Sequence, residues 1–100
     1  MTISITIDGK KVIFELDGRL DTTTSPKLQE SLTPVFDDSI DEIILDFKNL
    51  SYISSAGLRV LLMGQKLASA KQKPMSICNV SEEVMEVFEM TGFADMLTIA

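Results

Sequence analysis

The N-terminal part of the chain alternates apolar and polar side chains. Residues 3–7 place isoleucine at every second position, with serine or threonine between, which predicts a strand with one buried face. Asp8-Gly9 favours a hairpin turn. The β-branched and aromatic run at residues 12–16 predicts the antiparallel partner of the first strand, and Asp17-Gly18 is expected to end it.

The next segment carries signals for a helix start. Four hydroxyl residues from Thr22 to Ser25 precede Pro26, and capping hydroxyls followed by a proline suit the first turn of a helix. The helix is expected to begin between Thr22 and Pro26, with an apolar stripe at Leu28, Leu32, Val35 and Phe36. Pro34 predicts a kink or an early end, because it lacks the N–H needed for a helical hydrogen bond.

The second half of the chain alternates compact apolar runs with helical patterns. Residues 42–47 form a hydrophobic run between polar turns, which predicts a central strand buried on both faces. A long helix is expected over residues 54–71, a short strand over 75–80, and a third helix over 81–91. Ser81 is the predicted N-cap of this third helix, and Gly92 ends it. Residues 96–99 are a candidate edge strand.

This order of elements predicts one fold class. Two strands followed by alternating helices and strands imply an α/β domain with a mixed sheet. We expect a single domain over residues 1–100, with a mixed β-sheet of four to five strands and about three to four packed helices.

Composition narrows the possible functions. The chain is 45% hydrophobic and 24% charged, as in ordinary globular proteins, and contains one cysteine and no histidine. Cys78 has no disulfide partner within the chain, and the usual zinc sites and Cys-His nucleophiles are excluded, so no metal or cofactor is expected. A net charge of −6 repels a phosphate backbone, which argues against a nucleic-acid partner.

Membrane and targeting signals are not found in the sequence. Residues 1–10 have neither a basic start nor an apolar block, as a secretory signal requires. The most apolar stretch, residues 58–70, is interrupted by Arg59, Gln65 and Lys66, and is shorter than the ~20 residues that cross a bilayer. The sequence therefore predicts a cytoplasmic protein with no membrane segment.

Candidate chemistry is concentrated where residues 54–71 begin. Ser54 is placed as the helix N-cap, which leaves Ser55 in the first turn, where free N–H groups and the helix dipole favour an added negative charge. Phosphorylation of Ser55 would therefore be tolerated and would change the charge of a contact surface. On the residues alone, plain capping is the common role of serine here, and regulation is the alternative.

A helical wheel divides this helix into two sides. The inner side, where the small glycines would let the helix lie close to the sheet, holds Gly57, Val60, Leu61, Gly64, Leu67 and Ala68. The outer side holds Ser55, Arg59, Leu62, Lys66 and Ser69. Leu58, Leu62 and Met63 are expected to be left outside the core. Apolar residues beside a serine and two cations form a candidate docking face, and the simpler alternative is a helix covered on two sides.

Two motifs resemble those of the STAS domains, and among them the bacterial anti-sigma factor antagonists. One runs from Asp46-Phe47 through Tyr52-Ile53-Ser54-Ser55-Ala56-Gly57-Leu58, and the other is Gly18-Arg19-Leu20-Asp21 followed by Pro26. The resemblance extends over the whole chain. It implies a protein that, when unphosphorylated, binds an anti-sigma factor serine kinase and frees a sigma factor.

The same resemblance implies roles for individual residues. By position, Ser55 is the residue that the kinase phosphorylates, a serine phosphatase reverses the reaction, and Asp21 is the family acid beside the site. Many members have aspartate where this chain has Ser54, so Ser54 is a rival acceptor. Taken alone, Asp21 is more often a turn or capping residue. Apart from Asp21, the expected partner-binding residues are Ser54, Ser55, Leu58, Arg59, Leu62, Met63 and Lys66.

A second function class stays open beside this one. The same surface could dock permanently, as in an accessory STAS subunit of a signalling or lipid-transport assembly, without any kinase. An enzyme is the least favoured class, because the sequence offers no histidine, metal cluster or Gly-rich phosphate loop.

Overall fold

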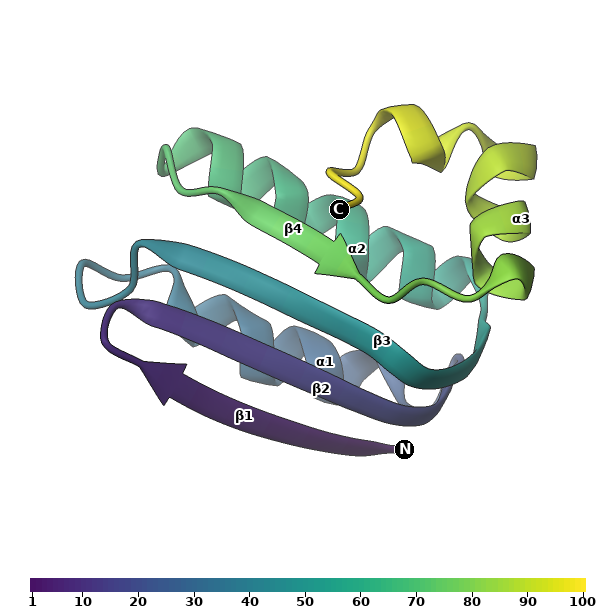
Figure 1. Ribbon diagram of the computed structural model, residues 1–100, viewed down its shortest axis with the longest axis horizontal. Coiled ribbons are helices and arrows are strands. Elements are labelled where there is room, and N and C mark those ends of the chain that lie inside the picture. The colour runs from purple at the N-terminus through teal and green to yellow at the C-terminus, as the bar shows by residue number, and fades with distance from the viewer.

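A mixed four-stranded sheet organises the computed structural model, which describes residues 1–100 (Figure 1). The strands are β1 (Thr2–Asp8), β2 (Lys11–Leu20), β3 (Glu42–Ile53) and β4 (Met75–Cys78), in the spatial order β1-β2-β3-β4. The helices are α1 (Ser25–Leu32), α2 (Ser55–Ala70) and α3 (Glu82–Thr91), with 3₁₀ turns η1 (Thr33–Val35) and η2 (Phe93–Asp95). β1 pairs antiparallel with β2, and the other pairs are parallel. The predicted α/β fold class is confirmed.

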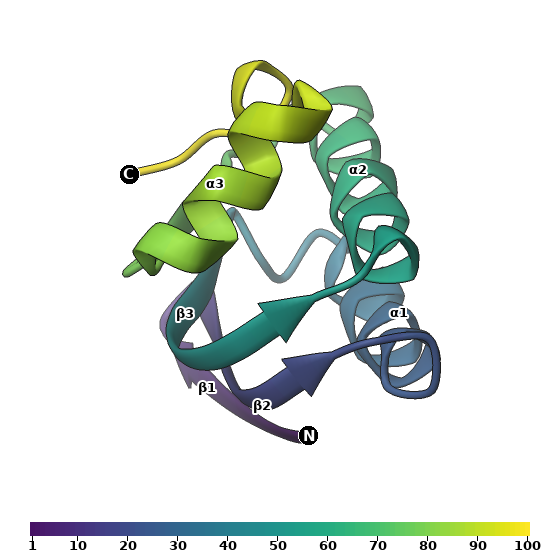
Figure 2. The same ribbon diagram turned by 90° about the vertical axis from the view of Figure 1, so that its right-hand side faces the viewer.

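α1 and α2 lie side by side on one face of the sheet, whereas α3 lies apart from them and crosses above β3 in the view of Figure 2. On that face one register row runs from Ile5 on β1 through Phe14 and Leu45 to Ile77 on β4, and its last three members are fully buried. Figure 1 views the sheet from its other side, with α1 and α2 behind. There Ile44 is only half-buried, so the expected burial of β3 on both faces is wrong.

β1 extends beyond the cover of the helices. Ile5 and Ile7 point to the helix side of the sheet, since they pair with Phe14 and Val12, yet they are 47% and 64% exposed. Figure 2 shows why, because α1 and α2 lie over the other strands and leave β1 at the margin. The alternation predicted the strand correctly, but the buried face expected for it is wrong at these two residues.

β2 and β3 are both longer than their apolar runs indicated. β2 continues through Gly18, at φ +112°, to Leu20, with register shifts between Glu15 and Asp17 and between Gly18 and Arg19. β3 runs on to Ile53, because buried Leu50 and Ile53 continue the pairing with β2. The expected end of β2 at Asp17-Gly18 is therefore wrong, and the extra residues carry both strands to the start of their helices.

The first helix follows the sequence signals closely. α1 begins at Ser25, after the N-cap Thr24, and gives way at Thr33 to a 3₁₀ turn that contains Pro34. The expected start and early end are both confirmed. In its apolar stripe, Leu28, Leu32 and Phe36 are buried, whereas Val35 is half-buried.

The C-terminal segment closes one edge of the sheet. Ser81 caps α3 by accepting a hydrogen bond from the Val84 N–H at 3.2 Å, as predicted. Residues 96–99 form an isolated bridge between Ile77 and Ile99 and not the expected strand. The Ile77 N–H donates to the Thr98 carbonyl, and the Ile77 carbonyl accepts from the Ala100 N–H, both at 2.9 Å. β4 ends at Cys78, two residues before its predicted end.

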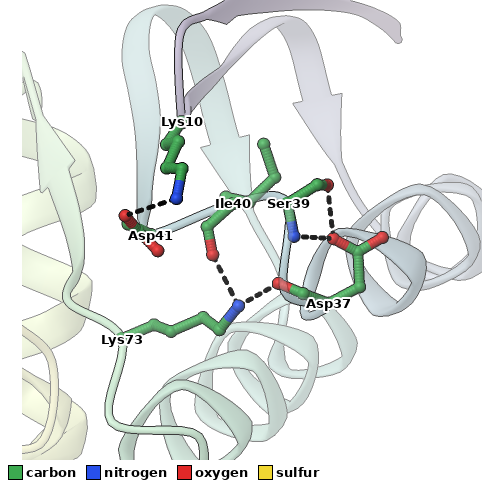
Figure 3. A network of polar contacts seen from close by, with 6 residues as sticks. All are labelled: Lys10, Asp37, Ser39, Ile40, Asp41 and Lys73. Atoms are coloured by element: carbon green, nitrogen blue, oxygen red, sulfur yellow. Dashed lines mark hydrogen bonds and ion pairs between the residues drawn. The ribbon is translucent and has the colours of Figure 1, made fainter.

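A lysine joins two loops at the opposite end of the sheet from the predicted site (Figure 3). Lys73 Nζ donates to the backbone carbonyls of Asp37 and Ile40, the second at 2.5 Å. The Asp37 carboxylate in turn accepts from the Ser39 N–H at 2.9 Å. These bonds hold the segment between η1 and β3 against the turn that leads into β4.

None of the helices combines the length and apolar character needed to cross a bilayer.

Candidate functional site

The predicted site residues meet where the parallel strands β2 and β3 end. Leu20 and Ile53 are register partners, and the Ser54 N–H donates to the Leu20 carbonyl at 2.9 Å. Asp21 and Ser54 are the residues that follow this pair, so the loop into α1 and the start of α2 are held side by side. In α/β sheets the carboxyl ends of parallel strands are the usual place for binding sites.

Ser54 is the N-cap of α2. Its backbone is extended, with φ −99° and ψ 173°, and its Oγ accepts a hydrogen bond from the Gly57 N–H at 3.3 Å. This bond satisfies one of the free N–H groups at the helix start. The predicted capping role is confirmed, and it leaves the half-buried Ser54 hydroxyl engaged with the backbone.

Ser55 occupies a different environment one residue later. It is the first residue of α2, its side chain is exposed, and its hydroxyl makes no hydrogen bond within the protein. The positive end of the helix dipole and unpaired N–H groups of the first turn surround this position. The structure therefore presents Ser55 to solvent in a place that favours an anionic group.

Asp21 shapes the loop beside Ser54. Its Oδ1 accepts hydrogen bonds from the Thr23 hydroxyl at 2.8 Å and from the backbone N–H groups of Thr23 and Thr24, both at 3.0 Å. These donors, the Thr23 hydroxyl first and the Thr24 N–H next, lower the pKa of Asp21 from 3.8 to about 2. Asp21 therefore has the turn role predicted for it, and its carboxylate is ionised at neutral pH.

Two glycines bring α2 close to its neighbours. A Cβ added at Gly57 would lie 2.8 Å from Leu20 Cγ and 3.0 Å from Ile53 Cγ1. At Gly64 the added Cβ would lie 2.8 Å from Leu32 Cδ2. The predicted close approach is confirmed, and the contact at Gly57 seats the first turn of α2 directly on the strand ends.

Two adjacent grooves run along the outer side of α2. The first, of about 360 Å³, lies between α1 and α2, where Pro26 and Gln29 face Ala56, Arg59 and Met63. The second, of about 490 Å³, lies farther along the helix and is lined by Arg59, Leu62, Met63, Lys66, Leu67 and Ala70. Arg59 and Met63 line both grooves, so together they form one continuous surface that begins next to Ser55.

Most of the predicted contact residues lie on this surface. Arg59 and Lys66 are exposed, and Leu62 and Met63 are half-buried beside them. Leu58 is the exception, because it is 4% exposed and belongs to the core, so its expected place outside the core is wrong.

The burial of Leu58 has a tertiary cause. α2 is covered by α1 along one side and by the C-terminal segment along the other, where Gln65 Oε1 accepts from the Thr98 N–H at 3.4 Å. Cover on two sides widens the buried arc of the helix. Pro26 and Gln29 were not predicted to line a groove, because their contact with α2 depends on how the two helices pack.

Charge is distributed unevenly between the helices. α2 carries Arg59 and Lys66 and no acidic residue. Residues 74–100 contain no basic residue and five acidic ones, which are Glu82, Glu83, Glu86, Glu89 and Asp95. The outer surface of α2 is therefore a cationic region on an acidic protein. No group of three His, Cys, Asp or Glu side chains converges where a metal ion could bind.

Comparison with known proteins identifies the fold family. The sequence matches the STAS domain family over residues 2–100. The chain belongs to the STAS domain family. This STAS domain is 31% identical over 99 residues to the anti-sigma-B factor antagonist of Staphylococcus aureus, and the match covers 99% of this chain and 92% of that protein. The predicted recognition is confirmed.

Solved structures agree with this family fold. The STAS domain matches the unphosphorylated form of the anti-sigma factor antagonist SpoIIAA with a TM-score of 0.84 and 21% identity, over 99% of this chain and 88% of that one. It matches the phosphorylated form of the Bacillus cell fate determinant SpoIIAA with a TM-score of 0.78 and 20% identity, over 99% and 91%. Both structures share the fold of this chain.

Proposed function

We propose that this STAS domain is an anti-sigma factor antagonist whose binding to an anti-sigma factor serine kinase is switched off by phosphorylation of Ser55. The observation that carries the proposal is the exposed, unpaired Ser55 hydroxyl in the first turn of α2, beside the cationic grooves. Family membership and the name of the Staphylococcus aureus relative support an anti-sigma factor as the partner.

The acceptor is Ser55 and not its rival Ser54. A kinase needs an accessible hydroxyl, and Ser55 is exposed, whereas Ser54 is half-buried and its Oγ caps the helix. Phosphorylation of Ser54 would require the loss of the bond from the Gly57 N–H, at a cost of about 1 kcal/mol for a typical N-cap. Phosphorylation of Ser55 breaks no hydrogen bond within the protein.

The kinase supplies the catalytic groups that phosphorylate Ser55. The Ser55 oxygen forms a bond to the γ-phosphorus of ATP, the bond to the bridging oxygen breaks, ADP leaves, and a base on the kinase takes the hydroxyl proton. Hydrolysis by a serine phosphatase returns the hydroxyl and releases inorganic phosphate. In this proposal the STAS domain is the substrate and the ligand of other proteins and not an enzyme.

The partner-binding surface extends from the phosphorylation site along α2. We assign to it Asp21 and Ser55 at the strand ends and the exposed side of α2, which carries Arg59, Leu62, Met63 and Lys66. Ser54 supports this surface by capping α2, and Leu58 supports it by packing in the core beneath. A phosphate at Ser55 adds a charge of about −1.5 to −2 to a surface that is otherwise cationic, so a partner that binds the unmodified surface through acidic groups is repelled.

The first test is binding of purified variants to an anti-sigma factor serine kinase from the same genome. Ser55→Asp should weaken binding by at least tenfold, and Ser54→Ala should retain it. Ser4→Asp is a matched control, because Ser4 is an exposed serine on β1, outside the surface assigned to the partner. Equal binding by Ser55→Asp and the wild-type protein would contradict the switch and favour a permanently docked accessory subunit.

The second test locates the phosphate directly. The kinase and ATP are incubated with the STAS domain, and the peptide that contains both serines is analysed by fragmentation mass spectrometry. Phosphate on Ser55 is expected, and Ser55→Ala should abolish incorporation. Phosphate on Ser54 would overturn the assignment of the acceptor while leaving a phosphorylation switch in place.

A further inference from the structure

One edge of the sheet is paired with another segment of the chain, and the other edge is open. At the β4 edge, the C-terminal segment pairs with Ile77 through the Thr98 carbonyl and the Ala100 N–H. At the other edge, β1 pairs only with β2, and no segment of the chain lies beside its outer side (Figure 1). An edge strand of seven residues thus presents a row of unpaired backbone N–H and carbonyl groups.

The side chains of β1 that point to the helix side of the sheet are apolar. Ile5 and Ile7 are 47% and 64% exposed, and together they are two of the five large hydrophobic residues on the surface. Ile5 ends the register row that runs inward through Phe14 to the core. The apolar side of the sheet therefore continues past the last covered strand and stops at an unpaired edge.

The usual protections of an edge strand are missing from β1. Natural edges are blocked by lysine, proline or a bulge, but residues 2–7 contain no charged residue and no proline. The pairing of β1 with β2 is in continuous register from Thr2 to Asp8, so no bulge turns the edge away. Asp8, at the end, is the one charged residue of the strand.

We propose that β1 is a self-association edge, on which a second copy of this chain pairs antiparallel, β1 to β1, about a two-fold axis at Ile5. This register pairs all seven residues of the strand, sets Ile3 opposite Ile7 and Ile5 opposite itself, and places Asp8 opposite Thr2. Isoleucine meets isoleucine on one face, and no two like charges are opposed. The self-complementary sequence of the strand is what selects a second copy as the occupant.

Pairing of this kind joins two four-stranded sheets into one continuous sheet. A single strand pair buries less than the ~1,200 Å² of a stable interface, so the dimer is weak and forms as protein concentration rises. β1 and α2 lie on opposite sides of the molecule in Figure 2. Association through β1 therefore leaves the grooves of α2 open in both copies, and it does not depend on the function proposed for them.

Sedimentation equilibrium at about 10 µM to 1 mM protein, the range of weak complexes, tests the proposal. The average mass of the wild-type chain should rise from one chain toward two with concentration. The double variant Ile5→Lys, Ile7→Lys should stay at the mass of one chain over the same range. Met90→Lys makes the same change at a hydrophobic residue of α3 that is 79% exposed, and it should behave as the wild type.

Two outcomes would overturn the proposal. A wild-type chain that is monomeric at every concentration would leave the β1 edge to an extended segment of another protein. A dimer that survives both lysines would place the contact elsewhere. Circular dichroism of each variant shows whether it is folded.

Cross-linking tests the register separately. In a Cys78→Ser background, Ile5→Cys places two thiols directly opposite each other, within the distance at which a disulfide forms. Thr6→Cys is the matched control, because residue 6 opposes residue 4 in this register and points to the other face. Oxidised Ile5→Cys should form the disulfide dimer at least tenfold faster than Thr6→Cys, and equal rates would contradict the two-fold axis at Ile5.

Discussion

Replacement of Gly57 by alanine tests how tightly the first turn of α2 is seated on the strand ends. The new Cβ would lie 2.8 Å from Leu20 Cγ, 2.9 Å from Leu20 Cδ2 and 3.0 Å from Ile53 Cγ1. Leu20 is fully buried and Ile53 is 4% exposed, so neither side chain has free space into which it can turn. Cγ of leucine is also a branch carbon, which moves only if the whole side chain moves.

The expected change in the free energy of unfolding combines two opposing contributions. Overpacking of a close-packed core costs about 1–3 kcal/mol, whereas alanine is favoured over glycine within a helix by about 1 kcal/mol. Three atoms at 3.0 Å or less place the overpacking cost in the upper part of its range. We therefore expect Gly57→Ala to lower the free energy of unfolding by about 1–2 kcal/mol, and the melting temperature by about 5–15 °C.

Urea denaturation followed by circular dichroism measures this change, and Gly64→Ala is the matched control in the same helix. The atoms closest to an added Cβ at Gly64 are Leu32 Cδ2 at 2.8 Å and Met75 Sδ at 3.2 Å, which belong to the flexible parts of their side chains. The helix preference for alanine then offsets the strain, and the stability should stay within about 1 kcal/mol of the wild type. Equal or higher stability of Gly57→Ala would refute the reasoning about close packing at that position.

Three further predictions concern charged and titratable groups. The pKa of Asp21 in the folded protein is about 2, below its usual 3.8. Its stabilising effect is therefore complete above about pH 4 and is lost as the pH falls toward 2. Over this window the urea midpoint of the wild type should fall more steeply than that of Asp21→Asn. Lys73→Met removes the donor to two loop carbonyls and should lower the free energy of unfolding by about 1 kcal/mol, measured by urea denaturation, with no change in m-value. Burial, and to a smaller extent the nearby Asp46 carboxylate, raises the pKa of the Cys78 thiol. A thiolate-directed reagent at pH 8 should therefore react more slowly with the folded protein than with the protein in concentrated urea. It should react faster with folded Asp46→Asn than with the folded wild type.

Local signals in the sequence were sufficient for the start and end of α1 and for the caps of α2 and α3. Ser54 and Ser81 each accept the hydrogen bond expected of an N-cap, because capping depends on residues within one turn of each other. The role of Gly57 was also predictable, since a glycine on the buried side of a helix implies a close neighbour. The phosphorylation site itself needed the resemblance to a family, because serine at a helix start is common.

Features that depend on packing between distant elements were not predictable in this way. The alternation at Ile5 and Ile7 reports which side of the strand is apolar, but not that the covering helices end before β1. Leu58 was expected outside the core because a helical wheel assumes cover from one side, whereas α2 is covered on two. The polar residues Lys48 and Asn49 interrupt the apolar pattern of β3, so the sequence did not indicate its second half, which is stabilised by pairing with β2.

The separation of charge between α2 and the last quarter of the chain has a consequence for the speed of association. A net charge of −6 slows the approach of any acidic protein, but residues 74–100 hold five acidic and no basic residues, whereas α2 carries Arg59 and Lys66 and no acidic residue. An approaching acidic partner is therefore rotated toward α2 before contact, over distances of about one Debye length, or ~10 Å at 0.1 M salt. Ionic strength should then change how quickly a partner finds this STAS domain more than how long the complex lasts.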